Sequence, residues 1–212
     1  FLKALSRGDL GKSLYTNRPV TTDIAQFLPA TLELCIVSAI VMVLLGLPIG
    51  ILSAHFRGRM PDHLGRLVAL IAVCTPAFVW GVILQLFFGY FWPIFPIEGQ
   101  LMQSTPVPPH VTGFLLIDSL VAGNGAAFLD ALYHLVLPAT ALAMSGLGQC
   151  ARLTRSNMIE VYDKPYVEME RAYGFRPFRI ATRYAFRPAF IPTLTILGLE
   201  FAAMLGNAFL VE

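Results

Sequence analysis

Charged side chains that could recognise another molecule are concentrated in one block of the sequence, from Tyr162 to Pro192. Apolar runs long enough to cross a bilayer flank this block on both sides. A polar block between two membrane spans must lie in water, and its wealth of Lys and Arg predicts the cytoplasmic side. On local pattern alone, an ordinary solvated membrane loop explains the block as well as a docking surface does. Its charged residues are Lys164, Arg171, Arg176, Arg179, Arg183, Arg187, Asp163, Glu168 and Glu170.

The inner part of this block is predicted to form a short helix. Tyr166 to Tyr173 contains no Pro or Gly and has the pattern of an amphipathic helix. Gly174 is expected to end it, as glycine commonly does just after a helix C-terminus. Pro177 then prevents a simple continuation.

The sequence contains no arrangement typical of a catalytic centre. It has no phosphate-binding Walker motif, no HExxH and no CxxC, and no Ser/His/Asp or Cys/His set in a credible context. Cys35, Cys74 and Cys150 stand singly in apolar runs, which favours neither disulfides nor a metal site. We therefore expect no enzyme activity, cofactor or metal in this chain, and ATP hydrolysis, if used, must come from a partner.

The composition is that of a membrane protein. The chain is 56% hydrophobic and 13% charged, with a mean hydropathy of +0.67, whereas soluble domains are about 25% charged. The chain starts at Phe1 and stops at Glu212, at the end of an apolar run. We therefore expect an internal piece of a longer membrane protein.

Apolar runs predict an all-α, polytopic helical bundle with four spans in a single transmembrane domain, 1–212. A helix needs about 20 apolar residues to cross the hydrocarbon core. Pro76 is expected to kink the second span and Pro138 to interrupt the third. The segment around Asp118 is too short for a span and suits a short re-entrant or surface-packed helix. The predicted spans are about 29–54, 67–92, 131–151 and 188–211, with a cytoplasmic loop at 160–187.

Charge predicts how these spans are oriented. No Lys or Arg lies between Arg66 and Arg152, which leaves an acidic loop that is expected outside. The short basic segment from His55 to Arg66 is expected to be a cytoplasmic turn. The basic residues before Asp23 go against this bias, which weakens away from the span ends.

Several separate motifs, in order, resemble one family. They are GDLGKSLYTNRPV near the N-terminus, PATLEL from Pro29, TPAF from Thr75, ARLTRSNMIEVY from Ala151, and in the loop Tyr166-Val167, Arg171-Ala172, Gly174, Arg187 to Ala189 and Pro192. Together they look like the permease subunit of a dipeptide- or oligopeptide-type ABC importer. The importer signature there is Glu-Ala-Ala, three residues, then Gly. Glu168 and Gly174 hold its outer positions, while Met169 and Glu170 replace both alanines.

The resemblance implies a function and a set of partners. The complete permease would have six transmembrane helices, of which this chain holds the second to the fifth, in the bacterial inner membrane. It would pair with a second homologous permease subunit, two ATPase subunits that use ATP and Mg, and an extracytoplasmic solute-binding protein; nucleic acid is not expected. The implied coupling helix, which docks on the ATPase, comprises Tyr166, Val167, Glu168, Glu170, Arg171, Ala172 and Gly174.

Two other classes stay open: an ion-coupled secondary transporter, and a membrane subunit without a transport role. A secondary transporter usually has ionisable residues on several spans, and only Glu200 is clearly intramembrane here. Glu200 and Asn207 are candidate residues of the translocation pathway, although a protonated Glu200 in a helix interface is an alternative. The transported solute is not identified by the sequence.

Overall fold

The computed structural model describes residues 10–14 and 17–211, and the predicted N-terminal motif therefore lies partly outside the described residues. Within the described part, helices form the regular structure, joined by turns and by a long irregular loop at 92–114. An isolated bridge lies between Lys12 and Pro19. The all-α fold class is confirmed. The elements in order are α2 (Val20–His55), α3 (Met60–Cys74), α4 (Ala77–Leu84), η1 (Gln85–Phe91), α5 (Leu115–Val121), α6 (Gly125–Tyr162), α7 (Pro165–Ala172), α8 (Pro177–Arg179), η2 (Ile180–Ala185) and α9 (Phe186–Val211).

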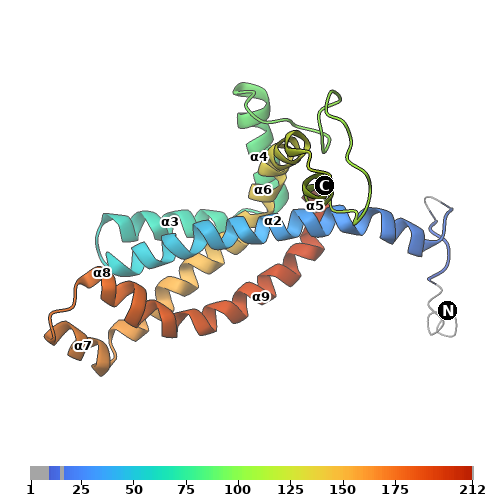
Figure 1. Ribbon diagram of the computed structural model, residues 1–212. Helices are drawn as coiled ribbons and strands as arrows, with labels where there is room; N and C mark the ends of the chain where they lie inside the picture. Colours follow the sequence, from blue (N-terminus) through green and yellow to red (C-terminus); the bar gives the residue numbers. More distant parts are fainter. Residues whose placement is uncertain (1–9, 15–16, 212) are drawn as a thin grey trace.

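Among the residues that the structure describes, three helical segments are each long and apolar enough to cross a membrane: α2, α6, and the continuous stretch Pro177–Ala208, most of which is α9. They run along the length of the molecule in Figure 1. The predicted spans 29–54, 131–151 and 188–211 lie within α2, α6 and α9, respectively. The extra turns of α6 carry the helix well beyond its apolar part, as far as the start of the charged loop.

The second predicted span, 67–92, differs from a single kinked helix. It is divided between α3 and α4–η1, whose axes are bent by 106°; in Figure 1 α4 turns sharply away from α3. Thr75 between them is extended, with φ −100° and ψ 123°. A residue before proline is pushed out of the helical region, and proline itself lacks the N–H for an internal helix hydrogen bond. Pro76 therefore breaks the helix and begins a new one.

The core lies where α2, α6 and α9 meet. Met42, Leu142 and Met204 are buried there. Small residues let the backbones approach closely: a Cβ on Gly46 would lie 2.9 Å from the Cβ of Cys150, and one on Gly50 would lie 2.7 Å from the carbonyl oxygen of Ala151. Helices in membranes associate through such close van der Waals packing, because lipid gives no hydrophobic drive. The outer faces are apolar and exposed, as at Leu44 and Leu199.

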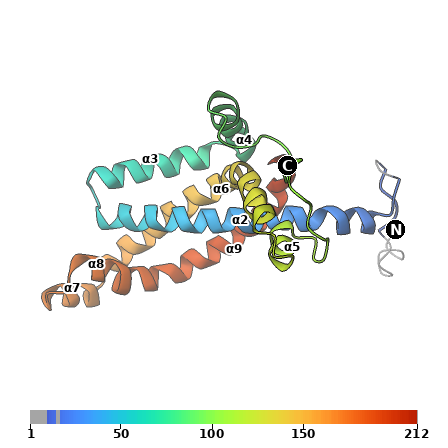
Figure 2. The same cartoon turned by 45° about the horizontal axis from the view of Figure 1, so that its top comes forward.

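Buried carboxylates hold the loop that connects η1 to α6. Glu33 of α2 accepts hydrogen bonds from the N–H groups of Leu115 (3.1 Å) and Leu116 (2.6 Å), at the start of α5. Accordingly, α5 lies against α2 in Figure 2. Asp118 accepts bonds from the N–H groups of Val111, Thr112 and Gly113 at 2.8–3.1 Å. Residues far apart in the sequence therefore fix the loop to the bundle.

Candidate functional site

Helix α7 is a small surface element anchored by one side chain. Proline at its first position lacks only an N–H that would be unpaired there anyway. Val167 is fully buried against Met158, Ile180 and Ala185, which come from α6 and η2. The predicted helix, Tyr166 to Tyr173, agrees with Pro165–Ala172 to within a residue at each end. The anchoring contact sets how α7 sits on the end of the bundle.

The C-terminus of α7 is closed by a Schellman motif around Gly174. The N–H of Gly174 donates to the carbonyl of Arg171 (3.0 Å), and that of Phe175 to the carbonyl of Glu170 (3.3 Å). Gly174 has φ +78°, and a Cβ there would meet nothing within 4 Å. Conformation rather than space therefore demands glycine at this position.

An exposed apolar stripe lies along α7. Tyr166, Met169 and Tyr173 are 40%, 51% and 73% exposed, and they follow the i, i+3, i+7 spacing of one helix face. Phe178, just beyond the turn, is also exposed. Met169, Tyr173 and Phe178 are not among the predicted site residues, although their spacing is visible in the sequence. Large apolar residues gathered on one exposed helix face are typical of a protein or membrane contact.

The charged residues predicted for this site lie in different surroundings. Arg171 lies over the ring of Tyr162, 5.6 Å from its centroid, and so turns back toward α6. Ala172 is exposed. The carboxylates of Glu168 and Glu170 make no hydrogen bond or ion pair within the part of the chain that the structure describes. They are thus available to an external partner.

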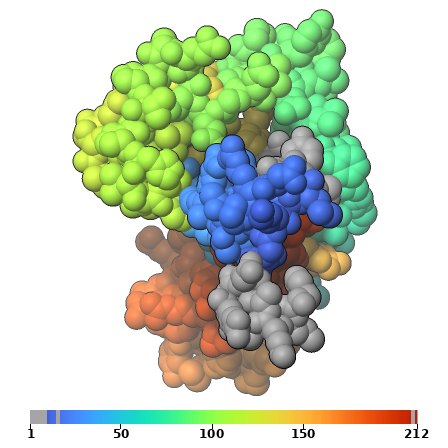
Figure 3. Space-filling model, turned by 90° about the vertical axis from the view of Figure 1, so that its right-hand side faces the viewer, coloured from blue at the N-terminus to red at the C-terminus, as the bar shows by residue number. Residues whose placement is uncertain are grey.

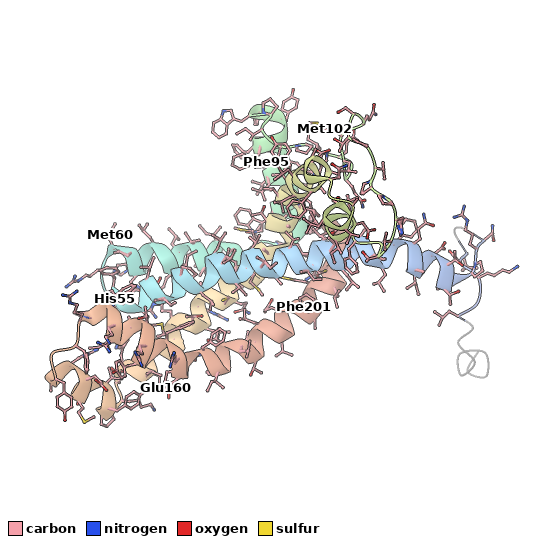
Figure 4. The ribbon with its side chains drawn as sticks, viewed as in Figure 1. His55, Met60, Phe95, Met102, Glu160 and Phe201 are labelled. Atoms are coloured by element: carbon pink, nitrogen blue, oxygen red, sulfur yellow. The ribbon has the colours of Figure 1, made fainter. Side chains whose placement is uncertain are left out.

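The ends of α2 and α6 lie near α7 at this end of the molecule. His55, at the end of α2, and Glu160, near the end of α6, are labelled in Figure 4 on the same side as α7. Arg57 and Asp163 form an exposed ion pair at 3.7 Å. A cavity of 590 Å³ lies between these segments, lined among others by His55, Arg57 and Arg171.

A buried ion pair ties the turn between α2 and α3 to α6. Arg155 donates from Nε and Nη2 to the two carboxylate oxygens of Asp62, at 2.6 and 2.9 Å. The N–H of Gly58 donates to Asp62 as well, at 2.9 Å. The hydrogen bonds from Arg155 lower the pKa of Asp62 to about 2, against the opposing effect of burial. The sequence pattern indicated only loop charges here, because the two partners are far apart in the chain.

Glu200 and Asn207 share one face of α9, since they are seven residues apart. Phe201, the neighbour of Glu200, marks this part of α9 in Figure 4. Glu200 is partly buried at the edge of the face that packs on α6. Its Oε2 would lie 3.5 Å from a Cβ on Gly146. The described residues offer it no hydrogen-bond or ionic partner. Asn207 is exposed.

The end of the molecule opposite α7 contains a cavity of 420 Å³ between α2, α6 and the connecting loop. Its polar lining includes Glu33, Gln85, Glu98 and His134. Figure 3 views this end, where green segments of the loop and α4–η1 lie around the blue start of α2. The ring of His134 bonds to the carbonyl of Asp130 (2.9 Å) and lies 3.2 Å from its carboxylate. This histidine is therefore hydrogen-bonded within its own helix.

Comparison with known proteins relates this arrangement to transport. A family model described as binding-protein-dependent transport system inner membrane component matches residues 46–212. A probable D,D-dipeptide transport system permease protein of Escherichia coli is 43% identical over 213 residues, covering 100% of this chain and 62% of that protein. A di/tripeptide transport system permease protein of Pseudomonas aeruginosa is 39% identical over 208 residues, covering 98% of this chain and 62% of that protein.

A more distant relative carries a different name. A putrescine export system permease protein of Escherichia coli is 30% identical over 215 residues, covering 100% of this chain and 67% of that protein. The chain thus spans about 62% of the length of the two more similar relatives. The family match extends over most of the chain and includes α6, α7 and α9 in full. This multi-pass membrane chain belongs to the family of binding-protein-dependent transport system inner membrane components.

Proposed function

We propose that this chain forms part of the membrane-spanning permease of an ATP-binding-cassette importer for dipeptides or oligopeptides. It lies in the bacterial inner membrane with α7 in the cytoplasm. It pairs with a second, homologous permease subunit, and an extracytoplasmic binding protein delivers the solute. Two ATPase subunits, which use ATP and Mg, drive the cycle, and this chain itself catalyses no reaction.

The structure of α7 is the observation that best supports the proposal. The helix is anchored by the buried Val167 and ends at the turn around Gly174. It exposes an apolar stripe, and the carboxylates of Glu168 and Glu170 have no partner among the described residues. A short helix with these properties can transmit a movement of a docked protein to α6 and η2. We therefore assign ATPase coupling to Tyr166, Val167, Glu168, Glu170, Arg171, Ala172 and Gly174, with Met169 and Tyr173 added.

The translocation pathway in this proposal follows α9. A carboxylate within a span is costly unless it meets water or protein, and such residues usually face a bundle interior or a water-filled cavity. Glu200 has no partner among the described residues, and Asn207 continues the same face. We therefore infer that this face meets the pathway or the second permease subunit.

Uptake into membrane vesicles tests the function directly. The complete transporter, with its ATPase and binding protein, should accumulate a labelled dipeptide only when MgATP is supplied. Uptake driven by an ion gradient without ATP would favour a secondary transporter instead. The absence of any uptake in a fully assembled complex would favour a subunit without a transport role.

Retention of the ATPase tests the coupling helix. Met169→Asp places a charge in the middle of the apolar stripe and should reduce the amount of ATPase that copurifies with the permease. Val107→Asp is the matched control, because Val107 is also an exposed apolar residue but lies in the loop at the other end of the molecule. Equal ATPase retention in both variants would show that the apolar stripe does not dock the ATPase.

A further inference from the structure

A groove of 360 Å³ lies between α3 and α6, next to the buried ion pair but on the outer surface. Its α3 wall includes Arg66, Leu70 and Val73, and its α6 wall includes Arg152 and Arg155. The back is closed by α2, because a Cβ on Gly65 would lie 2.0 Å from the Oγ of Ser53. Helix α2 therefore lies behind the groove, which opens on the outer surface of the bundle.

The groove is polar at one end and apolar at the other. Arg66, Leu70 and Val73 follow the i, i+4, i+7 spacing of one face of α3. A rise of 1.5 Å per residue extends this face over ~10 Å from the guanidinium end toward the middle of the predicted span. Leu70 is 61% exposed, so the apolar part is uncovered. The walls thus match the polarity of a phospholipid: the arginine end suits a charged headgroup, and the apolar end suits an acyl chain.

The charges in the groove favour an anion. Three arginines line the groove region, Arg66, Arg152 and Arg155. Asp62 is the carboxylate near them, and Arg155 already binds both of its oxygens. Arg66 lies 3.5 Å from the same carboxylate, and its side chain is half exposed. Arg152 bonds only to the neutral side chain of Gln149 among the described residues. The groove therefore keeps a net positive charge at the level where both predicted spans end.

We propose that this groove binds an anionic phospholipid of the cytoplasmic leaflet, of the phosphatidylglycerol class. The phosphate lies between Arg66 and Arg152, and an acyl chain lies along Leu70 and Val73. Basic pockets between transmembrane helices on the cytoplasmic side are suited to such headgroups. The lipid site rests on the membrane orientation in the proposed function, but it does not require peptide transport.

Native mass spectrometry of the complete transporter can count bound lipid. The complex is prepared in nanodiscs of phosphatidylcholine with a minor share of phosphatidylglycerol. It is then released from the nanodisc in the mass spectrometer, and the mass of the complex with its bound lipids is measured. The parent protein should retain phosphatidylglycerol in excess of its share of the bilayer. The double variant Arg66→Gln, Arg152→Gln should reduce this preference about tenfold, which lies within what two basic residues near a membrane surface contribute. The double variant Arg66→Lys, Arg152→Lys should keep most of it.

The control and a competitor distinguish the alternatives. Arg176→Gln with Arg183→Gln removes two exposed cytoplasmic arginines outside the groove and should leave the lipid preference unchanged. Glycerol 3-phosphate, which has the anion without acyl chains, should not displace the lipid. Displacement by it would indicate a site for soluble anions and overturn the lipid assignment. An equal lipid count in the Gln double variant and the parent, or no enrichment in the parent, would also overturn it. Because the readout is lipid mass, the result is independent of whether peptide uptake is observed.

Discussion

At position 174 the backbone, and not the available space, restricts the side chain. Gly174 has φ +78°, and nothing lies within 4 Å of the position that a Cβ would take. An L-residue in the left-handed region costs ~1–2 kcal/mol, and a β-branched residue is worse there. Since about 1.4 kcal/mol is tenfold in an equilibrium constant, Gly174→Val should largely lose the docked geometry of α7. We expect normal membrane insertion but loss of uptake, with ATPase activity lost or no longer stimulated by loaded binding protein.

Gly174→Asn is the matched control, because asparagine tolerates this conformation better than valine. It should retain more uptake than Gly174→Val at the same expression level. Substitutions of Glu168 or Arg171 should act in the same direction but more weakly, since each would remove only one polar contact to the docked ATPase. Normal uptake with normally coupled ATPase activity in the Gly174→Val complex would contradict the assignment of α7 as the coupling element.

Glu200 is the second residue whose surroundings lead to a prediction. A carboxylate at the centre of a span costs ~2.5–3.5 kcal/mol on insertion scales unless it faces water or protein. The Oε2 of Glu200 would lie 3.5 Å from a Cβ on Gly146, and this carboxylate has no partner among the described residues. Glu200→Gln keeps the size and hydrogen bonding and should preserve assembly. Glu200→Leu should impair peptide uptake at equal complex yield.

The two variants distinguish a role of Glu200 in the translocation pathway from a structural role in a helix interface. If Glu200 only fills an interface in its protonated form, Leu should increase or preserve the thermal stability of the complex without affecting uptake. Full uptake by the Glu200→Leu complex would therefore refute a functional role for this carboxylate.

At the scale of elements, the ion pair between Asp62 and Arg155 connects the α2–α3 turn to α6. The pKa of Asp62 is lowered to about 2 from 3.8, so its charged form stabilises the folded state. This contribution is fully present above pH ~4 and is lost as the pH falls through about 2. Asp62→Asn should lower the thermal unfolding temperature of the purified protein at pH 7, and its difference from the parent should shrink as the pH falls from 4 toward 2.

The control for this prediction is Asp163→Asn. Asp163 pairs with Arg57 at 3.7 Å, and both side chains are more than half exposed; exposed pairs of this kind contribute little to stability. Its unfolding temperature should match that of the parent at all pH values. A deficit in Asp62→Asn that did not change with pH would show that lost packing, and not lost charge, caused it.

Local sequence signals were enough to predict some elements but not the contacts between them. The short helix at α7 and its glycine stop follow from the absence of breakers and from Gly174 itself. Pro76 indicated a bend, but its size depends on how α3 and α4 pack on α6. The hydrogen bonds from α5 to Glu33 and from Arg155 to Asp62 join residues more than 80 positions apart, and no local pattern encodes such pairing.

At the scale of the whole molecule, the charge pattern and the fold predict opposite sides for the two ends. The loop without Lys or Arg and helix α5 lie at one end, and α7 and α8 lie at the other (Figure 1). Single cysteines on exposed residues can test this. Ser104 and Arg179 are both exposed, whereas Asp118 is buried and binds its own loop. Ser104→Cys should react with a membrane-impermeant maleimide in spheroplasts, and Arg179→Cys should react only after the membrane is opened.

The natural cysteines set the background for this labelling. Cys35 and Cys150 are buried, but Cys74 is exposed, so Cys74→Ala is introduced into every variant. The parent with this change alone should stay unlabelled on both sides. Since α6 is the single predicted crossing between Ser104 and Arg179, labelling of both cysteines from the same side would contradict the four-span topology. Opposite-side labelling with α7 outside would keep the number of spans but move the coupling helix away from any cytoplasmic ATPase.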